Sequence, residues 1–275
     1  LTPGPETMPG NPEPALSLRE ALRQGRSMLG LAACVLRGPE IVLVTRSAGF
    51  DWLLIDTEHA PIDLAEASRM AVAAQLAGLP ALIRTLGPDV PDLARMLDIG
   101  AEGLVVPHVD SAAQARRIVE ACRFPPHGRR SVPGPLPSFG FDMPPVPEMM
   151  SRAEARTSLV AMVESVAGLS EIEAIAAVPG IDAVMIGAND LATDLGRPGA
   201  LEHPDVHAAF TRIARATQSA GKVFGVIGLP EALLASHGVS LGARLILAAN
   251  DINLLLDGAT SCLLYTSDAA DDTPC

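Results

Sequence analysis

The sequence predicts an α/β protein folded as a closed (β/α)₈ barrel, and three observations carry this prediction. Eight short apolar runs, most of them β-branched, occur along the chain. Amphipathic, helix-like stretches separate most of them, an alternation typical of a parallel sheet. Eight repeats close a barrel, and most runs follow one another at about 20 to 40 residues. A chain of 275 residues, 48 % of them hydrophobic, is large enough for one such domain.

Each predicted strand is an apolar run too short for a helix, and several end abruptly at a carboxylate, an arginine or a histidine. In chain order the predicted strands are Met28–Cys34, Trp52–Asp56, Ala81–Arg84, Gly103–Pro107, Leu159–Glu164, Ala183–Gly187, Val223–Ile227 and Arg244–Ala248. The predicted helices between them are Glu40–Ser47, Leu64–Leu76, Val90–Ile99, Ala112–Cys122, Leu169–Ala177, Val206–Ala220 and Glu231–Ser236.

The two ends of the chain differ from this pattern. Residues 1–14 are rich in proline and glycine without periodicity, and we expect a disordered leader there. The barrel domain is predicted to span residues 15–259. Residues 260–275 form an atypical tail of small and acidic residues, which resembles translated adapter sequence and is suspected not to be native to the gene. We expect the last helix to end near Leu256 and the tail to be disordered or poorly packed.

One connection is too long for a simple turn. Phe124–Met150 contains eight prolines and has no sustained periodicity. A loop of this length in a compact domain is often a lid over a site, and Arg129, Arg130 and His127 would then contact an anionic substrate. A solvated excursion with no role in binding is an equal alternative.

Composition excludes several classes of function. The formal net charge is −12, and the chain has no cluster of basic residues, so a nucleic-acid partner is not expected. No run approaches the roughly 18 apolar residues of a membrane span, and we expect a cytoplasmic protein. Its cysteines, Cys34, Cys122, Cys262 and Cys275, lack metal-ligand spacing, and we expect reduced thiols.

Polar residues at the carboxyl ends of the strands are the candidates for chemistry, because the active site of a barrel lies on that face. They are Asp56, Glu58, His59, Arg84, His108, Glu164, Asn189 and Asp190. Two acids from adjacent strands can hold a divalent cation and leave positions for substrate and water, and Glu164 and Asp190 are that pair. The alternative for each acid is a helix cap or a surface charge.

The other candidates each have a structural alternative. Arg84 requires an anionic partner, supplied either by the protein or by a substrate. His59 is a candidate general base, or else a histidine at a helix start. We expect His108 to be structural. The only lysine, Lys222, precedes a strand and so lies on the face opposite the site. A Schiff-base mechanism needs a site lysine, so any carbonyl chemistry is expected to depend on a metal.

From about Gly30 to Ala259 the sequence resembles the HpcH/HpaI aldolase family. The resemblance rests on several long motifs in the same order: GFDWLLIDTEHAP, ALIRTLG, RMLDIGAEGLVVPHVDSAAQARRIVEACRFPPHGRRS, the VES at 163–165, and VPGIDAVMIGANDLATDLG. It implies a TIM barrel of the phosphoenolpyruvate/pyruvate-binding type. It also implies that Mg²⁺, Mn²⁺ or Co²⁺ binds pyruvate or a related 2-oxo acid, which the enzyme condenses reversibly with an aldehyde.

The resemblance also implies a role for individual residues. Glu164 and Asp190 become the metal ligands, and Arg84 contacts the oxygens of pyruvate. His59 becomes the proton-transfer base and is paired with the carboxylate of Asp98. Asp56 either helps to orient His59 or lies behind the residues that contact the substrate and metal. The substrate would lie against Gly187, Ala188 and Asn189. The chain departs from the family pattern at Met162 and at Arg129-Arg130, which bears on the choice of aldehyde more than on the metal chemistry.

Two rival interpretations remain at this point. One is a lyase similar to the citrate lyase β subunit, acting on acyl-CoA thioesters, which would need a basic rim for the CoA phosphates. The other is a catalytically silent barrel that serves as an oligomeric scaffold. The resemblance further implies a homo-oligomer, a hexamer in the family, whose assembly we expect to be weakened here by the atypical last helix.

Overall fold

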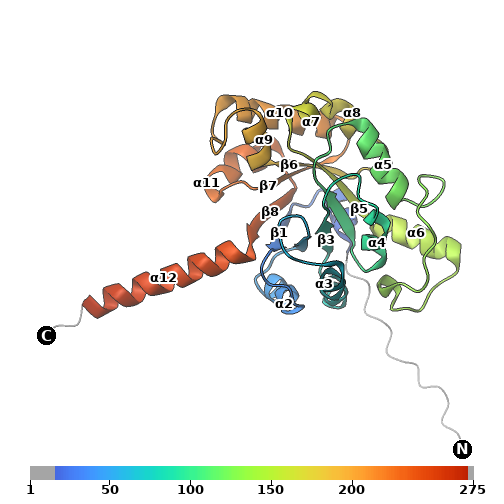
Figure 1. Ribbon diagram of the computed structural model, residues 1–275, viewed down its shortest axis with the longest axis horizontal. Helices are drawn as coiled ribbons and strands as arrows, with labels where there is room; N and C mark the ends of the chain where they lie inside the picture. Colours follow the sequence, from blue (N-terminus) through green and yellow to red (C-terminus); the bar gives the residue numbers. More distant parts are fainter. Residues whose placement is uncertain (1–15, 272–275) are drawn as a thin grey trace, which may run out of the picture.

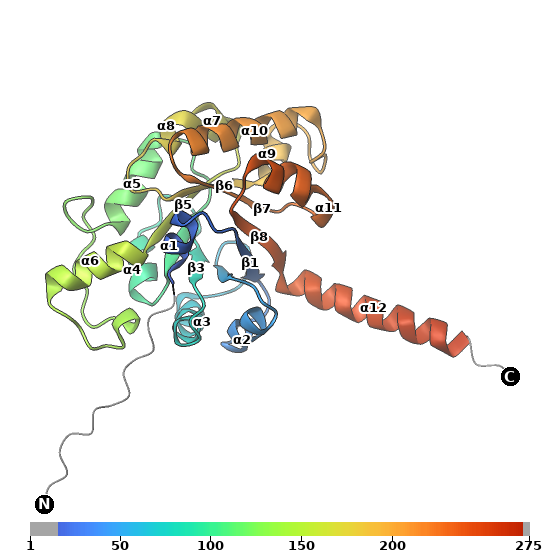
Figure 2. The same cartoon turned by 180° about the vertical axis from the view of Figure 1, so that it is seen from behind.

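The computed structural model describes the backbone of residues 16–271 and the side chains up to residue 263. Eight parallel strands form a closed barrel in the order β1 to β8, each paired with its neighbours in sequence and β8 with β1. Helices surround the barrel, and one long helix projects away from it (Figures 1 and 2). The predicted (β/α)₈ fold is therefore confirmed. The predicted leader, residues 1–14, lies outside the described residues.

The strand predictions are correct to within one or two residues. The strands are β1 Met28–Ala33, β2 Trp52–Asp56, β3 Ala81–Arg84, β4 Gly103–Val106, β5 Ser158–Val163, β6 Ala183–Gly187, β7 Val223–Ile227 and β8 Leu245–Asn250. The helices are α1 Leu18–Arg23, α2 Glu40–Ser47, α3 Leu64–Leu76, α4 Leu93–Asp98, α5 Ala112–Cys122, α6 Val146–Arg156, α7 Val166–Ser170, α8 Ile172–Ala176, α9 Ala188–Asp194, α10 Pro204–Ser219, α11 Glu231–Leu233 and α12 Asp251–Asp271. Short helical turns are η1 Pro137–Phe139, η2 Leu234–Gly238 and η3 Val239–Leu241.

Two layers of apolar side chains hold the barrel together, because successive residues of a strand point to opposite faces. On β2, Trp52 and Leu54 point into the barrel, whereas Leu53 and Ile55 pack against the outer helices. The inner layer also includes residues of α1, which closes the N-terminal opening of the barrel. The amino ends of the strands are thus covered, and their carboxyl ends remain available for a site.

The proline-rich connection is not a lid. It follows helix α5 and leads through α6 into β5, so it lies toward the amino ends of the strands and not over their carboxyl ends. Its last residues, from Val146, already belong to α6. Phe124, Leu136 and Met149 form a separate small core there. Arg129 and Arg130 form ion pairs within the chain, with Glu120 and Asp98, so the alternative with no role in binding fits better, although part of the segment is packed and not solvated.

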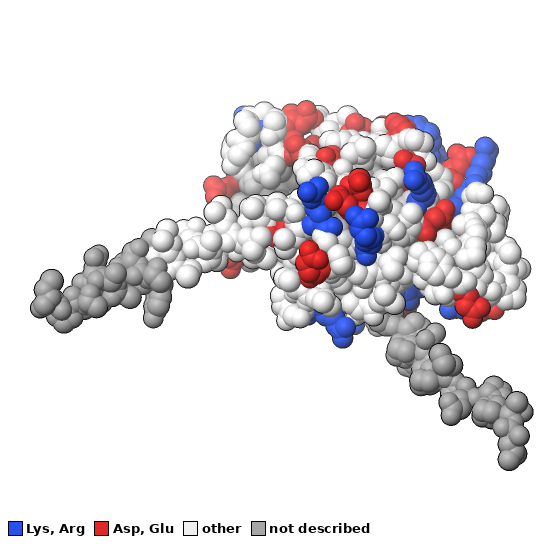
Figure 3. All heavy atoms as spheres, turned by 60° about the horizontal axis from the view of Figure 1, so that its bottom comes forward, with Lys and Arg blue, Asp and Glu red and all other residues white. Residues whose placement is uncertain are grey.

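The last helix continues past the point where the sequence predicted its end. α12 runs from Asp251 to Asp271 without interruption, which corrects the expected stop near Leu256. Its side chains from Ile252 to Leu263 are exposed, and the side chains of the predicted tail beyond Leu263 lie outside the described residues. Figure 3 shows this arm with few charged side chains on its described part. Residues 272–275 lie outside the described residues.

Candidate active site

The ends of β2 and β3 hold a buried ion pair. Asp56 and Arg84 are direct neighbours in the sheet register. Arg84 donates from Nε to Asp56 Oδ1 at 2.9 Å and from Nη2 to Oδ2 at 2.5 Å. Of the two partners that the sequence left open for Arg84, the structure provides a protein carboxylate. These bonds use Nε and Nη2, and Nη1 makes no hydrogen bond to the described part of the chain.

Asp56 is held as a carboxylate. Burial alone would raise its pKa, but the hydrogen bonds and charge of Arg84 outweigh this and the net pKa is lowered. The backbone N–H groups of Glu58 and His59 also donate to Oδ1, at 3.0 and 3.3 Å. Asp56 therefore orients His59 through its backbone and not through the imidazole ring.

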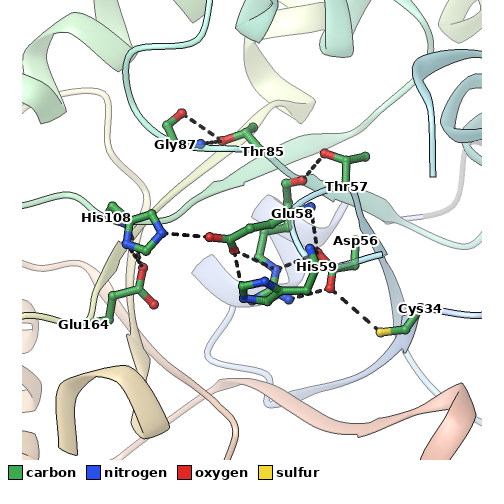
Figure 4. Close-up of polar contacts among 10 residues, drawn as sticks. Cys34, Asp56, Thr57, Glu58, His59, Thr85, Gly87, His108 and Glu164 are labelled. Atoms are coloured by element: carbon green, nitrogen blue, oxygen red, sulfur yellow. Dashed lines mark hydrogen bonds and ion pairs between the residues drawn. The ribbon is translucent and has the colours of Figure 1, made fainter. Parts of the chain in front are cut away.

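Glu58, which the sequence offered as a candidate without a specific role, connects the two halves of the site. Its side chain is only 9 % exposed. Oε2 lies 3.4 Å from Arg84 Nε and 3.7 Å from His59 Nε2, and Oε1 lies 2.8 Å from His108 Nε2. The signal available was its place two residues beyond β2, beside Asp56 and His59. In Figure 4 its carboxylate lies between His59 and His108.

His108 belongs to the site, which corrects the expectation that it is merely structural. Its ring bridges two carboxylates, with Nε2 at 2.8 Å from Glu58 and Nδ1 at 3.0 Å from Glu164 Oε1. Its backbone N–H also donates to Glu164 Oε1 at 2.7 Å. The φ angle of 57° is rare for a residue with a side chain and indicates a constrained backbone.

Glu164 lies at the end of β5 in an environment that disfavours its charge. Burial raises its pKa to about 7, with further contributions from the charges of Glu58 and Asp190, while the backbone and ring of His108 oppose the shift. Gly187 leaves the space that this carboxylate occupies, because a Cβ there would lie 2.3 Å from Glu164 Oε2. A divalent cation would relieve the repulsion between the carboxylates.

The remaining predicted site residues lie in the segment that joins β6 to α9. Gly187 and Ala188 are buried where α9 begins, and Asp190 lies exposed in its first turn. Asp190 is close enough to Glu164 to influence its pKa. Asn189 donates weakly to the carbonyl of Gly228 after β7, at 3.5 Å. Both predicted acids thus lie at the carboxyl ends of the strands, Glu164 directly after β5 and Asp190 in the first turn of α9 after β6.

The two members of the predicted proton-transfer pair are not brought together. The imidazole of His59 is 64 % exposed and approaches Glu58. Asp98 instead ends α4, on the side where β4 begins, and accepts from Arg130 Nη2 at 2.7 Å. Helices of a barrel run back toward the amino ends of the strands, which is why the end of α4 lies away from the site.

Neither Cys34 nor Lys222 is suited to act as a nucleophile at this site. Cys34 lies 3.9 Å from Asp56 Oδ2, and burial together with the charges of Asp56 and Asp251 raises the pKa of its thiol to about 12. A thiol in this state is a poor nucleophile. Lys222 directly precedes β7 and so lies at the amino end of that strand, as predicted. Cys34 and Cys122 are free thiols.

The donor set fits a half-open metal site. Among residues 16–263, no group of three or more His, Cys, Asp or Glu side chains surrounds one point. A site with Glu164 and Asp190 as its only protein ligands would leave the other positions of a hard divalent cation to substrate and water. The buried carboxyl group of Glu164, whose pKa burial raises, and its position against Gly187 are the observations that fit such a cation.

No helix in the described part of the chain is long and apolar enough to cross a membrane.

The family model of the HpcH/HpaI aldolase/citrate lyase family matches residues 35–250. A 4-hydroxy-4-methyl-2-oxoglutarate aldolase of Hapsidospora irregularis is 38 % identical over 86 % of this chain and 90 % of its own. A hydroxypyruvate/pyruvate aldolase of Pseudomonas aeruginosa is 37 % identical over 88 % of this chain and 90 % of its own.

Solved structures agree with the sequence comparisons. An HpcH/HpaI aldolase from Desulfitobacterium hafniense superimposes with a TM-score of 0.86 at 31 % identity, covering 94 % of this chain and 98 % of its own. A citrate lyase β subunit from M. tuberculosis, complexed with oxaloacetate and magnesium, shares the fold only, at 19 % identity over 83 % of this chain and 93 % of its own, with a TM-score of 0.54. With the barrel, the strand-end acids and these matches in agreement, the chain belongs to the HpcH/HpaI aldolase/citrate lyase family.

Proposed function

We propose that this chain is a metal-dependent aldolase that reversibly cleaves 4-hydroxy-2-oxo acids to pyruvate, or a related 2-oxo acid, and an aldehyde. The observation that carries the proposal is the arrangement at the strand ends, where Arg84 from β3 and Glu164 from β5 are linked through Glu58 and His108. The aldolases named above are relatives at 37 % and 38 % identity.

Glu164 and Asp190 would hold Mg²⁺, Mn²⁺ or Co²⁺. When bound, such a cation polarises the keto group of the 2-oxo acid and stabilises negative charge on its oxygen. Gly187 keeps the space beside Glu164 open, since any larger residue would displace the carboxylate. The backbone N–H of His108 fixes the other oxygen of Glu164. The chain thereby orients one carboxylate from two sides before any ligand binds.

Arg84 would bind the carboxylate of the 2-oxo acid through Nη1. Asp56 holds the guanidinium by two bonds, and Glu58 approaches it from a second side. This fixes the plane of the fork, which a flexible ammonium group does not offer.

His59 would move the proton. Its imidazole is exposed beside Glu58, and its backbone is fixed by Asp56. A neutral imidazole can accept a proton from the methyl carbon of pyruvate or from the hydroxyl of the aldol. Asp98 as its partner stays a prediction, because within this chain Asp98 binds Arg130. Contact of the substrate with Gly187, Ala188 and Asn189 likewise stays a prediction.

The rival functions are weaker. Citrate lyase β resembles this chain at 19 % identity, which supports the shared fold alone. The presence of His59, Arg84, Glu164 and Asp190 together at the carboxyl ends of the strands speaks against a silent scaffold. Both rivals predict no release of pyruvate from 4-hydroxy-2-oxo acids.

The direct test is a pyruvate-release assay over a panel of 4-hydroxy-2-oxo acids. We expect activity with added Mg²⁺, Mn²⁺ or Co²⁺, loss of activity with EDTA, and recovery when the metal is restored. Borohydride added with pyruvate should leave no covalent adduct. A trapped adduct on Lys222 would overturn the metal mechanism, and no pyruvate from any member of the panel would overturn the aldolase assignment.

Exchange of the methyl protons of pyruvate isolates the role of His59. We expect His59→Ala to abolish exchange while binding of Mn²⁺, measured by electron paramagnetic resonance, stays unchanged. Because the side chain is largely exposed, the variant should fold as the wild type does. Exchange at the wild-type rate would remove His59 as the base.

We also propose a homo-oligomer in which the tail beyond Ala259 is dispensable. The arm α12 carries exposed apolar residues at Ile252, Leu254, Leu255 and Leu256, before the tail begins. A second copy of the chain is the partner that the resemblance implies. Light scattering of the full chain and of a variant lacking residues 261–275 tests this. Equal mass and activity are expected, whereas dissociation on deletion would make the tail a structural element.

A further inference from the structure

A cavity lies at the opposite end of the barrel from the proposed active site. It has a volume of about 250 Å³ and is bounded by α1 and by residues at the amino ends of β5, β6, β7 and β8. Four cationic side chains line it, Arg19, Arg23, Lys222 and Arg244, against a single carboxylate, Asp182. This concentration of positive charge is unusual in a chain whose formal net charge is −12.

The single carboxylate is already engaged. Asp182 Oδ1 accepts from Arg19 Nε at 2.8 Å, and Oδ2 accepts from Arg123 Nη2 at 2.5 Å and from the backbone of Leu159 at 2.9 Å. Arg244 donates to a backbone carbonyl, that of Leu22. Within the described residues, the side chains of Arg23 and Lys222 have no ion-pair partner. At least two positive charges at this cavity are therefore not neutralised by the protein.

A buried hydroxyl provides an independent sign of a ligand. Ser158, the first residue of β5, is 1 % exposed and lines the same cavity. Its Oγ is fully buried and has no hydrogen-bond partner among the described residues. Leaving such a group unpaired costs about 1 to 3 kcal/mol, so buried hydroxyls are normally satisfied. An oxygen of a ligand in the cavity would accept this hydrogen bond.

The titration of Lys222 agrees with an excess of positive charge. Burial lowers the pKa of its ammonium group, and the nearby charges of Arg19, Arg123 and Arg23 lower it further, against the opposing charge of Asp182. Arg19 is affected by Arg123 and Arg23 in the same way. These cations destabilise one another, and a bound anion would relieve that repulsion.

We propose that this cavity is a binding site for a small, doubly charged oxyanion, with a phosphoryl group as the ligand chemistry. Lys222, Arg19 and Arg23 would supply the positive charge, and Ser158 Oγ would donate to one oxygen. The cavity admits inorganic phosphate or the phosphoryl end of a small ester. Such a ligand would join α1 to the starts of four strands, far from the metal site. The inference does not depend on the aldolase chemistry.

The only lysine of the chain makes the test specific. Protein labelled with ¹⁵N-lysine gives one backbone amide signal, from Lys222. We expect inorganic phosphate, titrated at constant ionic strength against sodium chloride, to shift this signal saturably below about 10 mM. Methyl phosphate distinguishes the sources, since equal binding indicates a site for esters and weaker binding indicates a site for free phosphate.

Variants locate the site. We expect Arg23→Gln and Ser158→Ala each to weaken binding about tenfold, the effect of removing one charge-assisted or buried hydrogen bond. Arg46→Gln on α2 removes the same charge from an exposed position and should leave binding unchanged. Aldolase activity measured without phosphate should be the same in all three.

Two outcomes would overturn the inference. One is a linear shift without saturation, or an equal shift in wild type, Arg23→Gln and Ser158→Ala. The other is saturable binding that is lost in Arg84→Lys but kept in Arg23→Gln, which would place the phosphate at the strand ends on the other face. Because Arg23 is exposed, its variant tests the site even if Ser158→Ala folds poorly.

Discussion

The substitution Arg84→Lys separates the geometry of the buried fork from its charge. Arg84 makes two bonds to Asp56, at 2.9 and 2.5 Å, and lies 3.4 Å from Glu58. A lysine keeps the positive charge but bonds through a single nitrogen and cannot span both oxygens of Asp56. One charge-assisted hydrogen bond is then lost, worth about 1.5 to 3 kcal/mol. We expect the free energy of unfolding to fall by about 2 kcal/mol.

Catalysis should suffer independently of folding. If Nη1 orients the 2-oxo acid, the shorter and rounder ammonium misplaces it, and kcat/KM for pyruvate release should fall at least about tenfold, equivalent to roughly 1.4 kcal/mol of transition-state stabilisation. Urea unfolding and steady-state kinetics measure the two effects, and Arg46→Lys at an exposed site is the control. Wild-type kinetics in Arg84→Lys would refute the reasoning and return Arg84 to a structural salt bridge with Asp56.

Three further predictions use the same site. In Gly187→Ala the new Cβ would lie 2.3 Å from Glu164 Oε2, so we expect the rate of pyruvate enolisation to fall at least about tenfold. The control is Gly134→Ala, where a Cβ would have no neighbouring atom within 4 Å and wild-type rates are expected. Glu58→Gln should slow turnover with little loss of folded protein by circular dichroism, and unchanged turnover would make Glu58 structural. The pKa of Asp56 is lower in the folded protein than in the unfolded chain. Its ionised carboxylate therefore stabilises the folded state fully above about pH 4, and this contribution to the free energy of unfolding is lost as pH falls through the pKa of the folded state. The gap in unfolding free energy between wild type and Asp56→Asn should therefore narrow below that pH in urea titrations.

The sequence was sufficient for the barrel because each strand is a separate apolar run with its own boundary signal. Trp52–Asp56 and Ala81–Arg84 both end at a charge, and those ends coincide with the ends of β2 and β3. Where the hydrophobic signal was weak the prediction failed. α6 begins at Val146 among prolines, and a proline at the start of a helix costs nothing although it looks like a loop signal.

The site was only partly predictable for a different reason. Single residues at strand ends can be identified from sequence, but their partners depend on register and backbone conformation. The contacts that link Glu58 through His108 to Glu164 form with a positive φ angle at His108. No local sequence pattern indicates that angle. For the long connection Phe124–Met150 the sequence left a lid and a non-binding excursion as equal alternatives, because loop length alone does not distinguish them; its position between α5 and β5 excludes the lid.

Asp251 links the start of helix α12 to the site through hydrogen bonds. It is 3 % exposed at the first position of the helix, and its carboxylate accepts the backbone N–H groups of Cys34, Val35 and Leu36 at 2.7 to 3.0 Å. Cys34 in turn contacts Asp56, which holds Arg84. The orientation of the first turn of α12 is therefore coupled through one carboxylate to the loop after β1, which contacts the carboxylate that holds Arg84.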